Sequence, residues 1–516
     1  MSHSSPTPTM HDVHDEARDK VPDFGIPPSR ATSPASPVVR PGLNRTVTSG
    51  TRASRLSRIS SKLPNPERAA ALGPVAPPPP PPHLTKYAYH FFSPEIKFFR
   101  ALVVKILGMM VVLTTVIMWL AAPFYWGSLW KANHYTDKLT VRVIDRDGGD
   151  VGAGVTSFLL SQRKKGGLGY FVTSPSEFPT DAELYHDIVQ EGAWGAVVIN
   201  AGATDNLARA RASANASYDG RDAIQLVYAQ ARNEIATGSY MVPLATAHLS
   251  QITAQLGARS VASFLSTADA AALARLADAP GTLAAPLGFR PVNLRPYDQP
   301  VAQAITLVGL IYMLIFSFIC TMANNGAREI ISPYLTNRAY IAYRLISPFV
   351  LYFPLSFAFS LINLPFKLSF GANSNFTYAG AFFCFWFLMF LGMASVGLAT
   401  EVFITLVGPK FVSFTLIPLI IVNVSVAALP YELQPWIYRY GVAMPFNNAN
   451  HAIRFLIFGT RNELGRNFGI LLAWIVVSMV NIALATYFFR RKAVNEHAKQ
   501  VGEREKDTAL PDGRIV

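Results

Sequence analysis

The hydrophobic pattern of the chain is dominated by residues 301–322, VAQAITLVGLIYMLIFSFICTM, which contain no charged side chain. An α-helix of this length extends about 33 Å, which is enough to cross a hydrocarbon core of about 30 Å. A helix of a soluble protein would usually keep a polar face over such a length. We therefore interpret the stretch as a transmembrane helix rather than as the core helix of a soluble protein.

Five further apolar stretches have the length and composition of membrane spans. One precedes residues 301–322 and four follow in quick succession, so the sequence predicts an α-helical integral membrane protein with six transmembrane helices. Glycine and proline recur inside these stretches, as membrane helices tolerate. The additional predicted spans are residues 101–122, 345–366, 378–400, 411–429 and 467–489.

Residues 131–300 have the pattern of a water-soluble α/β domain. Short β-branched runs such as TVRVID and GAVVIN are each followed by a glycine-containing turn and a helix-like stretch. This alternation is typical of a mixed α/β fold. The strand patterns lie at 140–145, 167–173 and 195–200, and the helical patterns lie at 151–162, 204–214 and 243–279.

The N-terminal tail, residues 1–85, is rich in Ser, Pro, Thr and Arg, and six prolines occupy residues 77–82. This composition predicts disorder. The formal net charge of the chain is +13, and the basic tail suits either a solvated segment or attraction to an anionic cytoplasmic leaflet. It lacks the folded basic face with aromatics that nucleic-acid binding requires. The run RASRLSRIS places Ser57 and Ser60 in a basophilic-kinase pattern, which makes both candidate phosphorylation sites.

Charge near the spans predicts the orientation in the membrane. Arginines between the second and third spans and the run at 490–492 favour cytoplasmic termini, with residues 131–300 outside and 490–516 as a cytoplasmic tail. The glycosylation sequons at Asn215 and Asn375 fall outside in this arrangement. Four arginines between the fifth and sixth spans contradict the simple charge rule, namely Arg439, Arg454, Arg461 and Arg466.

The segment 430–466 is too long for a tight turn, and we predict that it is membrane-associated. It would form short helices lying on the outer leaflet, with His451 and Arg454 one turn apart and facing lipid phosphates. The alternative is an ordinary surface loop. In the membrane-associated interpretation, five apolar side chains insert among the acyl chains, namely Phe446, Phe455, Leu456, Ile457 and Phe458.

The sequence contains no recognisable catalytic, metal or cofactor motif, so we expect a protein that is not an enzyme and uses no cofactor. GGDVGAG at 148–154 lacks the ending of a phosphate-binding loop. Cys320 and Cys384 both lie in spans, so no disulfide is expected. We interpret Glu401 as a residue at the cytoplasmic boundary of its span. Asn423 and Asn481 lie at mid-depth, where an amide forms interhelical hydrogen bonds or lines a substrate path.

Several stretches resemble the fungal nitrosoguanidine-resistance membrane proteins over residues 100–495. The resemblance is carried by LRPYDQPVA followed by GLIYMLIFSF, by MPFNNANHAIRFLIFGTRNELGRNFGILLAW, and by GAWGAVVINAGAT, SYDG and AQARNE. That family is similar in layout to the permeases of type-two ABC exporters, with one span, a large external domain and five further spans. The resemblance implies a role in resistance to a mutagenic nitroso compound and other toxic chemicals, but it brings no defined binding residue.

Two functions follow from these observations. The first is a membrane protein that supports resistance as an export permease, which needs a partner ATPase because the chain has no nucleotide-binding domain. The second is a membrane organiser that transports nothing itself and alters lipid distribution or scaffolds other transporters. Both place the protein in the lipid bilayer, with the plasma membrane as the expected location, and both are compatible with a homo-oligomer. The weak candidates for substrate contact are Asn423, Asn481, His451 and Arg454.

Overall fold

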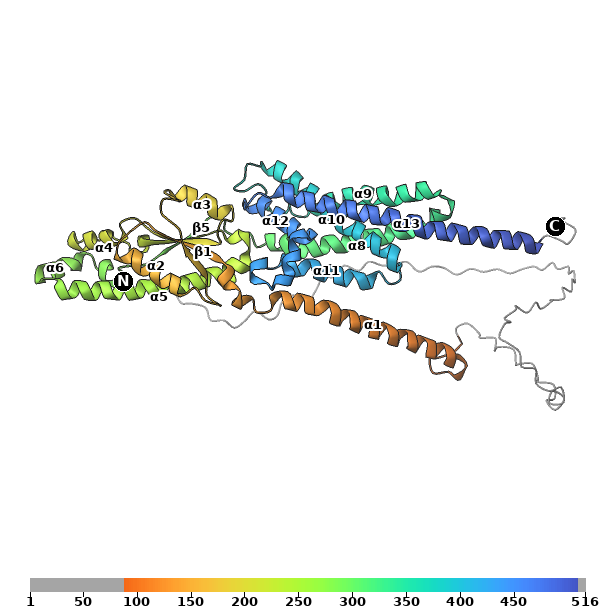
Figure 1. The fold of residues 1–516 in the computed structure, drawn as a ribbon, viewed down its shortest axis with the longest axis horizontal. Helices are drawn as coiled ribbons and strands as arrows, with labels where there is room; N and C mark the ends of the chain where they lie inside the picture. Colours follow the sequence, from red (N-terminus) through yellow and green to blue (C-terminus); the bar gives the residue numbers. More distant parts are fainter. Residues whose placement is uncertain (1–87, 509–516) are drawn as a thin grey trace, which may run out of the picture. The chain divides into compact units, whose positions relative to one another are not determined.

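A computed structural model describes residues 88–508, which form a sheet-containing α/β region and a helical region. The tail of residues 1–85, with Ser57 and Ser60, lies outside the described residues. Five of the described helices are long and apolar enough to cross a membrane (Figure 1). They are α1 (Lys97–Leu129), α8 (Gly309–Ile331), α9 (Asn337–Leu361), α10 (Tyr378–Val407) and α13 (Leu464–Thr508).

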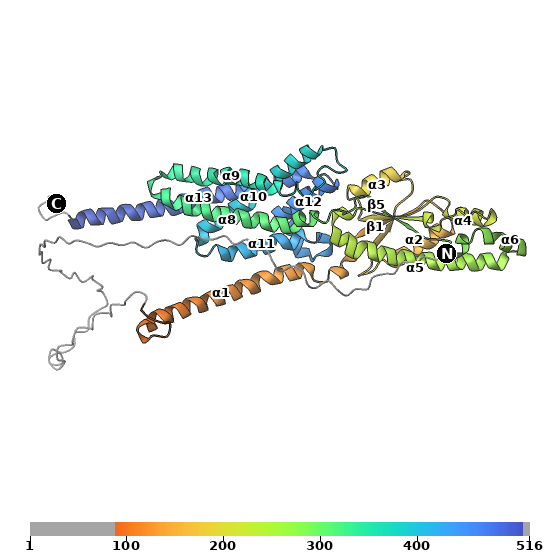
Figure 2. The ribbon, with the colours of Figure 1, turned by 180° about the vertical axis from the view of Figure 1, so that it is seen from behind.

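The predicted span at 411–429 differs from the other five. It forms α11 (Ser413–Ala427), a helix of 15 residues. At 1.5 Å per residue it measures about 22 Å, which is shorter than a hydrocarbon core of about 30 Å. The prediction of six full-length spans is therefore corrected to five long helices and one short apolar helix. In the chain path, α11 returns from the end of α10 toward the α/β region (Figure 2).

Helix α10 forms the core of the helical region, because most of its length is buried and it packs against α8, α9 and α13. Small residues make this close packing feasible. A β-carbon at Gly397 would lie 2.2 Å from the Tyr352 hydroxyl of α9, and one at Gly392 would lie 2.6 Å from the Met313 sulfur of α8. Helix α1 contrasts with α10: none of its most apolar window is buried, as expected for a lipid-facing helix.

The α/β region contains a five-stranded mixed sheet with the strand order β2-β1-β3-β4-β5. The pairs β1–β2, β1–β3 and β4–β5 are parallel, and β3–β4 is antiparallel. Three of these strands coincide with the predicted patterns, whereas β4 and β5 were not predicted. The strands are β1 (Thr140–Asp145), β2 (Gly169–Val172), β3 (Gly195–Ile199), β4 (Ile224–Tyr228) and β5 (Arg290–Asn293).

Helices cover both faces of the sheet because side chains alternate between the faces. Val143 and Ile199 pack in one core with residues of α2, α4 and α5, while Ile144 and Val198 pack in a second core with α3. The helix predicted at 243–279 ends early and is followed by short helices. The helices of this region are α2 (Asp150–Ser161), α3 (Asp181–Val189), α4 (Ala203–Ala212), α5 (Val242–Thr267), α6 (Ala270–Arg275) and α7 (Gly281–Ala284).

Shorter elements link the main helices and strands. The chain leaves β5 and enters α8 through a π-helical turn, Ala304–Val308, and a second π-helical turn, Ala236–Met241, precedes α5. Between α11 and α13 lie a 3-10 helix, Trp436–Ala443, and α12 (Pro445–Phe458). Arg295 Nε donates to the carbonyl of Gly459 at 2.9 Å, so the residues just after β5 are tied to the end of α12.

Candidate functional site

Arg454 is buried by the α/β region and does not face lipid. It is 4% exposed, and its Nη2 lies 2.5 Å from the Glu234 carboxylate. Its Nη1 donates to the Ala231 carbonyl at 3.0 Å and its Nε donates to the Asn450 side-chain oxygen at 2.9 Å. The expectation that this side chain pairs with lipid phosphate is therefore wrong. A carboxylate and a carbonyl of the same chain occupy the directions in which a phosphate would bind.

The apolar side chains of α12 are likewise buried inside the protein. The helix packs between α10, α11 and α13, and nearly all of its residues are inaccessible to solvent or lipid. Helix α12 is therefore neither an acyl-chain anchor nor an ordinary surface loop, and membrane association of the rest of segment 430–466 stays a prediction. The apolar face of α12 packs against helices of the same chain. The residues expected among acyl chains but buried here are Phe446, Phe455, Leu456, Ile457 and Phe458.

A polar cavity lies where α12 meets the α/β region. Its volume is about 190 Å³, and its lining includes His451, Arg454 and Arg232. The Arg232 guanidinium lies 3.7 Å from the centre of the Trp194 ring and forms ion pairs with Glu191 at 3.7 Å and Glu432 at 3.8 Å. We define the junction cluster as five residues that line this cavity, Glu191, Arg232, Glu432, His451 and Arg454, together with Glu234, which pairs with Arg454.

Burial shapes the protonation of the junction cluster. Burial raises the pKa of the Glu432 carboxyl above its usual value, and the nearby Arg232 pulls that pKa back down. Burial also lowers the pKa of His451, which favours its neutral form. The cluster thus holds alternating charges around a cavity large enough for a few ordered waters. Such an arrangement can hold α12 against the α/β region, and its ion pairs would break if the two separated.

The two predicted asparagines have different environments. Asn423 is buried, donates to the Leu419 carbonyl at 3.0 Å, and accepts a hydrogen bond from the Phe446 backbone at 3.3 Å. It thereby joins α11 to the first turn of α12, close to the junction cavity. Asn481 is exposed on α13, and it donates to the Val477 carbonyl of its own helix at 2.8 Å. The structure therefore buries Asn423 where α11 meets α12, the helix that carries His451 and Arg454, but leaves Asn481 on an outer face.

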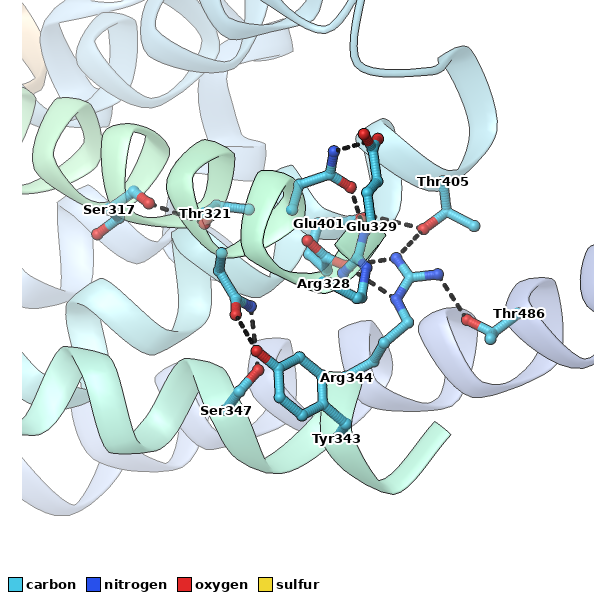
Figure 3. A network of polar contacts seen from close by, with 12 residues as sticks. Ser317, Thr321, Arg328, Glu329, Tyr343, Arg344, Ser347, Glu401, Thr405 and Thr486 are labelled. Atoms are coloured by element: carbon cyan, nitrogen blue, oxygen red, sulfur yellow. Dashed lines mark hydrogen bonds and ion pairs between the residues drawn. The ribbon is translucent and has the colours of Figure 1, made fainter. Parts of the chain in front are cut away.

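A second charged centre lies inside the helical region, and the sequence analysis missed it (Figure 3). Glu401 of α10 is 1% exposed and receives the guanidinium groups of both Arg328 from α8 and Arg344 from α9. Arg344 Nε donates to Glu401 Oε1 at 2.9 Å, and Arg344 Nη1 donates to Thr486 of α13 at 2.7 Å. These three charged residues form what we call the buried triad, and with Thr486 they join four helices.

The charges of the buried triad do not balance. Two guanidinium groups surround one carboxylate, which leaves an excess of one positive charge. Arg328 Nε and Glu401 Oε2 are also buried without a hydrogen-bond partner among the described residues. An incompletely paired ionic centre is costly in an apolar environment, and within membrane helices such residues usually mark a functional site. Glu401 lies six residues before the end of α10, near the end of the span where its sequence position placed it, and it is a buried ion-pairing residue there.

Polar side chains extend the triad along α8 and α9. Arg328 also contacts the Asn325 side-chain oxygen, and Asn325 donates to the exposed Glu329 carboxylate at 3.1 Å (Figure 3). One turn away, Asn324 donates to Ser347 at 3.0 Å and accepts from the Tyr343 hydroxyl at 3.2 Å. The triad thus lies at one end of a row of polar side chains between α8 and α9.

The remaining candidate residues are exposed or unpaired in the described part of the chain. Asn215 and Asn375 are both exposed, as a glycan acceptor must be, and their modification stays a prediction. Cys320 and Cys384 are free. Within residues 88–508, no group of three or more His, Cys, Asp and Glu side chains is arranged to hold a metal ion.

Comparison with known proteins gives one family and no structural relative. A 202-residue stretch is 27% identical to an uncharacterized endoplasmic reticulum membrane protein of Saccharomyces cerevisiae and covers 38% of this chain and 39% of that protein. The alignment therefore spans well under half of the relative. No solved structure matches. The family model DUF3533, described as a protein of unknown function, matches residues 110–480. The chain is thus a multi-pass membrane protein that belongs to the DUF3533 family.

Proposed function

We propose that this protein supports resistance to toxic compounds as an export permease whose helical region changes conformation around the buried triad. The observation that carries the proposal is the pairing of Glu401 with Arg328 and Arg344, all three buried where α8, α9 and α10 meet. Replacing a buried ionic group by packed apolar residues is often neutral or stabilising, so stability alone gives little reason for the triad. The resemblance to nitrosoguanidine-resistance proteins supplies the class of compound.

The chain path supports the permease layout. Helix α1 leads into the α/β region, and α8, α9, α10, α11 and α13 follow in alternating directions (Figure 1). We infer that α11 completes a sixth crossing despite its length, with local thinning of the bilayer or neighbouring backbone covering the difference. Six crossings place both termini in the cytoplasm and the α/β region outside. Protease added to sealed right-side-out vesicles should then spare an N-terminal tag, and loss of that tag would refute this topology.

Two charged centres lie at opposite ends of the helical region, which suits alternating access. The start of α10 is tied to α12, because Gly371 N donates to the Leu456 carbonyl at 2.7 Å, and α12 carries Arg454 of the junction cluster. Glu401 lies 23 residues after Tyr378, about 34 Å further along α10. We infer that the junction cluster closes the outer end and the buried triad closes the inner end, and that the two open in turn.

A permease of this kind needs an energy source outside the described chain. We propose a partner ATPase that binds the cytoplasmic ends of the helices. Export from the cell also requires the plasma membrane, whereas the yeast relative is named as an endoplasmic reticulum protein. Immunofluorescence of the tagged protein at native expression level distinguishes the two locations.

Survival under nitrosoguanidine tests the proposed role. Cells that lack the gene should be sensitive, cells with the wild-type gene resistant, and cells with Glu401→Gln nearly as sensitive as the deletion at matched protein levels. Glu329→Gln is the matched control, because Glu329 is an exposed acid near the same centre and should leave resistance unchanged. Full resistance with Glu401→Gln would remove the triad from the mechanism.

A groove between α8 and α9 favours the second function, a membrane organiser that acts on lipids. Its volume is about 720 Å³, its lining is mostly apolar, and it contains the polar side chains Asn324, Tyr343 and Ser347. A groove of this kind on the outer face of membrane helices suits a lipid chain beside a polar group. Efflux of labelled nitrosoguanidine from vesicles separates the two functions, because an organiser would protect cells without moving the compound.

A further inference from the structure

A cavity in the α/β region contains a buried arginine that has no acidic partner. The cavity measures about 690 Å³ and lies between α2, α4 and α5, with α6 at one side. Arg211 lines it and is 8% exposed. Among the described residues, no carboxylate forms an ion pair with this guanidinium. This site is separate from both the junction cluster and the buried triad, so its role does not depend on whether the helices transport a compound.

The hydrogen bonds of Arg211 hold the guanidinium in place without neutralising it. Nη1 donates to the Ser260 carbonyl at 3.2 Å and to the Ser260 hydroxyl at 2.9 Å, and Nη2 donates to the Thr282 carbonyl at 3.1 Å. The third nitrogen, Nε, is buried and has no partner among the described residues. A buried cation whose neighbours are only neutral acceptors carries an uncompensated desolvation cost, and an anion in the cavity would offset it.

The other residues that line the cavity indicate which kind of anion would fit. Arg259 of α5 and Arg275 of α6 also line the cavity, so three guanidinium groups face it against one carboxylate, Asp150. The apolar part of the lining is substantial, and the Phe264 ring lies 5.1 Å from the Arg211 guanidinium carbon. The volume falls in the range of sites that bind small organic molecules. The other apolar lining residues include Val151, Leu207, Leu256 and Leu287.

We propose that this cavity binds a small amphipathic organic anion, with its acidic group at Arg211 and between Arg259 and Arg275, and its apolar body against Phe264 and Leu256. The acidic group would accept charge-assisted hydrogen bonds from the Arg211 guanidinium and from the two more exposed arginines. The apolar body distinguishes this ligand from inorganic phosphate, which would leave the leucine and phenylalanine surface unfilled.

Isothermal titration of 4-phenylbutyrate into the full-length protein tests the proposal, with the protein in phosphatidylcholine nanodiscs and empty nanodiscs subtracted. We expect saturable binding with one ligand per chain. The neutral isostere 4-phenylbutanamide should bind at least tenfold more weakly, because it lacks the charge that pairs with arginine. Inorganic phosphate should also bind at least tenfold more weakly, because it lacks the apolar body.

Variants locate the binding within the cavity. Arg211→Met should weaken 4-phenylbutyrate binding by about tenfold or more. The double variant Arg259→Gln/Arg275→Gln changes only exposed side chains, so it should fold normally and still weaken binding severalfold. Arg209→Gln is the matched control, because Arg209 is exposed on the same helix and does not line the cavity. Absence of saturable binding, equal binding of the amide or of phosphate, or wild-type binding by the double variant would each overturn the proposal.

Discussion

Replacement of Glu401 by glutamine is the sharpest probe of the buried triad, because it removes the single negative charge and preserves the shape of the side chain. Both Arg328 and Arg344 then remain buried without an ionic partner. Removing one partner of a buried ion pair costs about 3–5 kcal/mol, and the retained amide oxygen recovers about 1 kcal/mol through a hydrogen bond. We therefore expect a net loss of about 3 kcal/mol, which is roughly a hundredfold change in an opening equilibrium.

Hydrogen exchange of the full-length protein in nanodiscs measures this loss where it occurs. Amides around Arg328, Arg344 and Glu401 should exchange roughly a hundredfold faster in Glu401→Gln than in the wild type. Adding Arg344→Gln should return part of the protection, because one of the two uncompensated cations is gone and neighbouring residues couple by about 0.5–3 kcal/mol.

The exposed Glu329 provides the control for this experiment. Glu329→Gln should change local opening by less than about 0.5 kcal/mol, as surface substitutions usually do. Equal exchange in Glu401→Gln and Glu329→Gln would refute the reasoning, because it would mean that the triad carries no uncompensated charge when the carboxylate is lost. A double variant less protected than the single one would refute the charge-imbalance argument in particular.

Three other predictions follow from the structure. Arg454→Glu places two carboxylates together at the junction cluster and should lower the free energy of unfolding by about 3–5 kcal/mol, with partial recovery when Glu234→Arg is added. Thermal unfolding in nanodiscs measures both changes. The exposed Arg290→Glu is the control and should change the free energy of unfolding by about 1 kcal/mol or less. Burial lowers the pKa of His248 in the folded protein, so the unfolded chain binds the proton first and stability falls as the pH drops below about 6.5. His248→Gln should therefore lose less thermal stability between pH 7.5 and 5.5 than the wild type does. An identical loss in both proteins would exclude this contribution. Asn215 should carry a glycan, so wild-type protein should shift in gel mobility on glycosidase treatment and Asn215→Gln should not; an untreated variant that migrates like the wild type would argue against an external α/β region.

Local patterns predicted much of the fold because each depends on neighbouring residues only. The uncharged run at 301–322 and the β-branched runs of β1 and β3 all formed the expected elements. Strand β5 was missed because its sequence, RPVN, combines a proline and an arginine with only one β-branched residue, so its strand form depends on pairing with β4. The span predicted at 411–429 was longer than helix α11 because apolar composition does not fix the residue at which a helix stops.

The charged centres could not be located from sequence because their partners are far apart along the chain. Arg454 and Glu234 are separated by 220 residues, and Glu401 lies 73 and 57 residues from its two arginines. An apolar helix face also looks the same whether lipid or protein covers it, which is why the side chains of α12 were assigned to acyl chains. One signal was available: Glu401 is an acid that directly follows a long apolar run, and such a residue needs a partner.

Efflux of radiolabelled nitrosoguanidine from sealed right-side-out vesicles tests the central claim most directly. Vesicles loaded with ATP and the compound, and prepared from cells expressing the wild-type protein at a matched level, should lose the label faster than vesicles from deletion cells. Vesicles with Glu401→Gln should lose it no faster than deletion vesicles, and those with Glu329→Gln should match the wild type. Equal efflux from wild-type and deletion vesicles, in strains that still differ in survival, would contradict an export permease and leave the membrane organiser as the function.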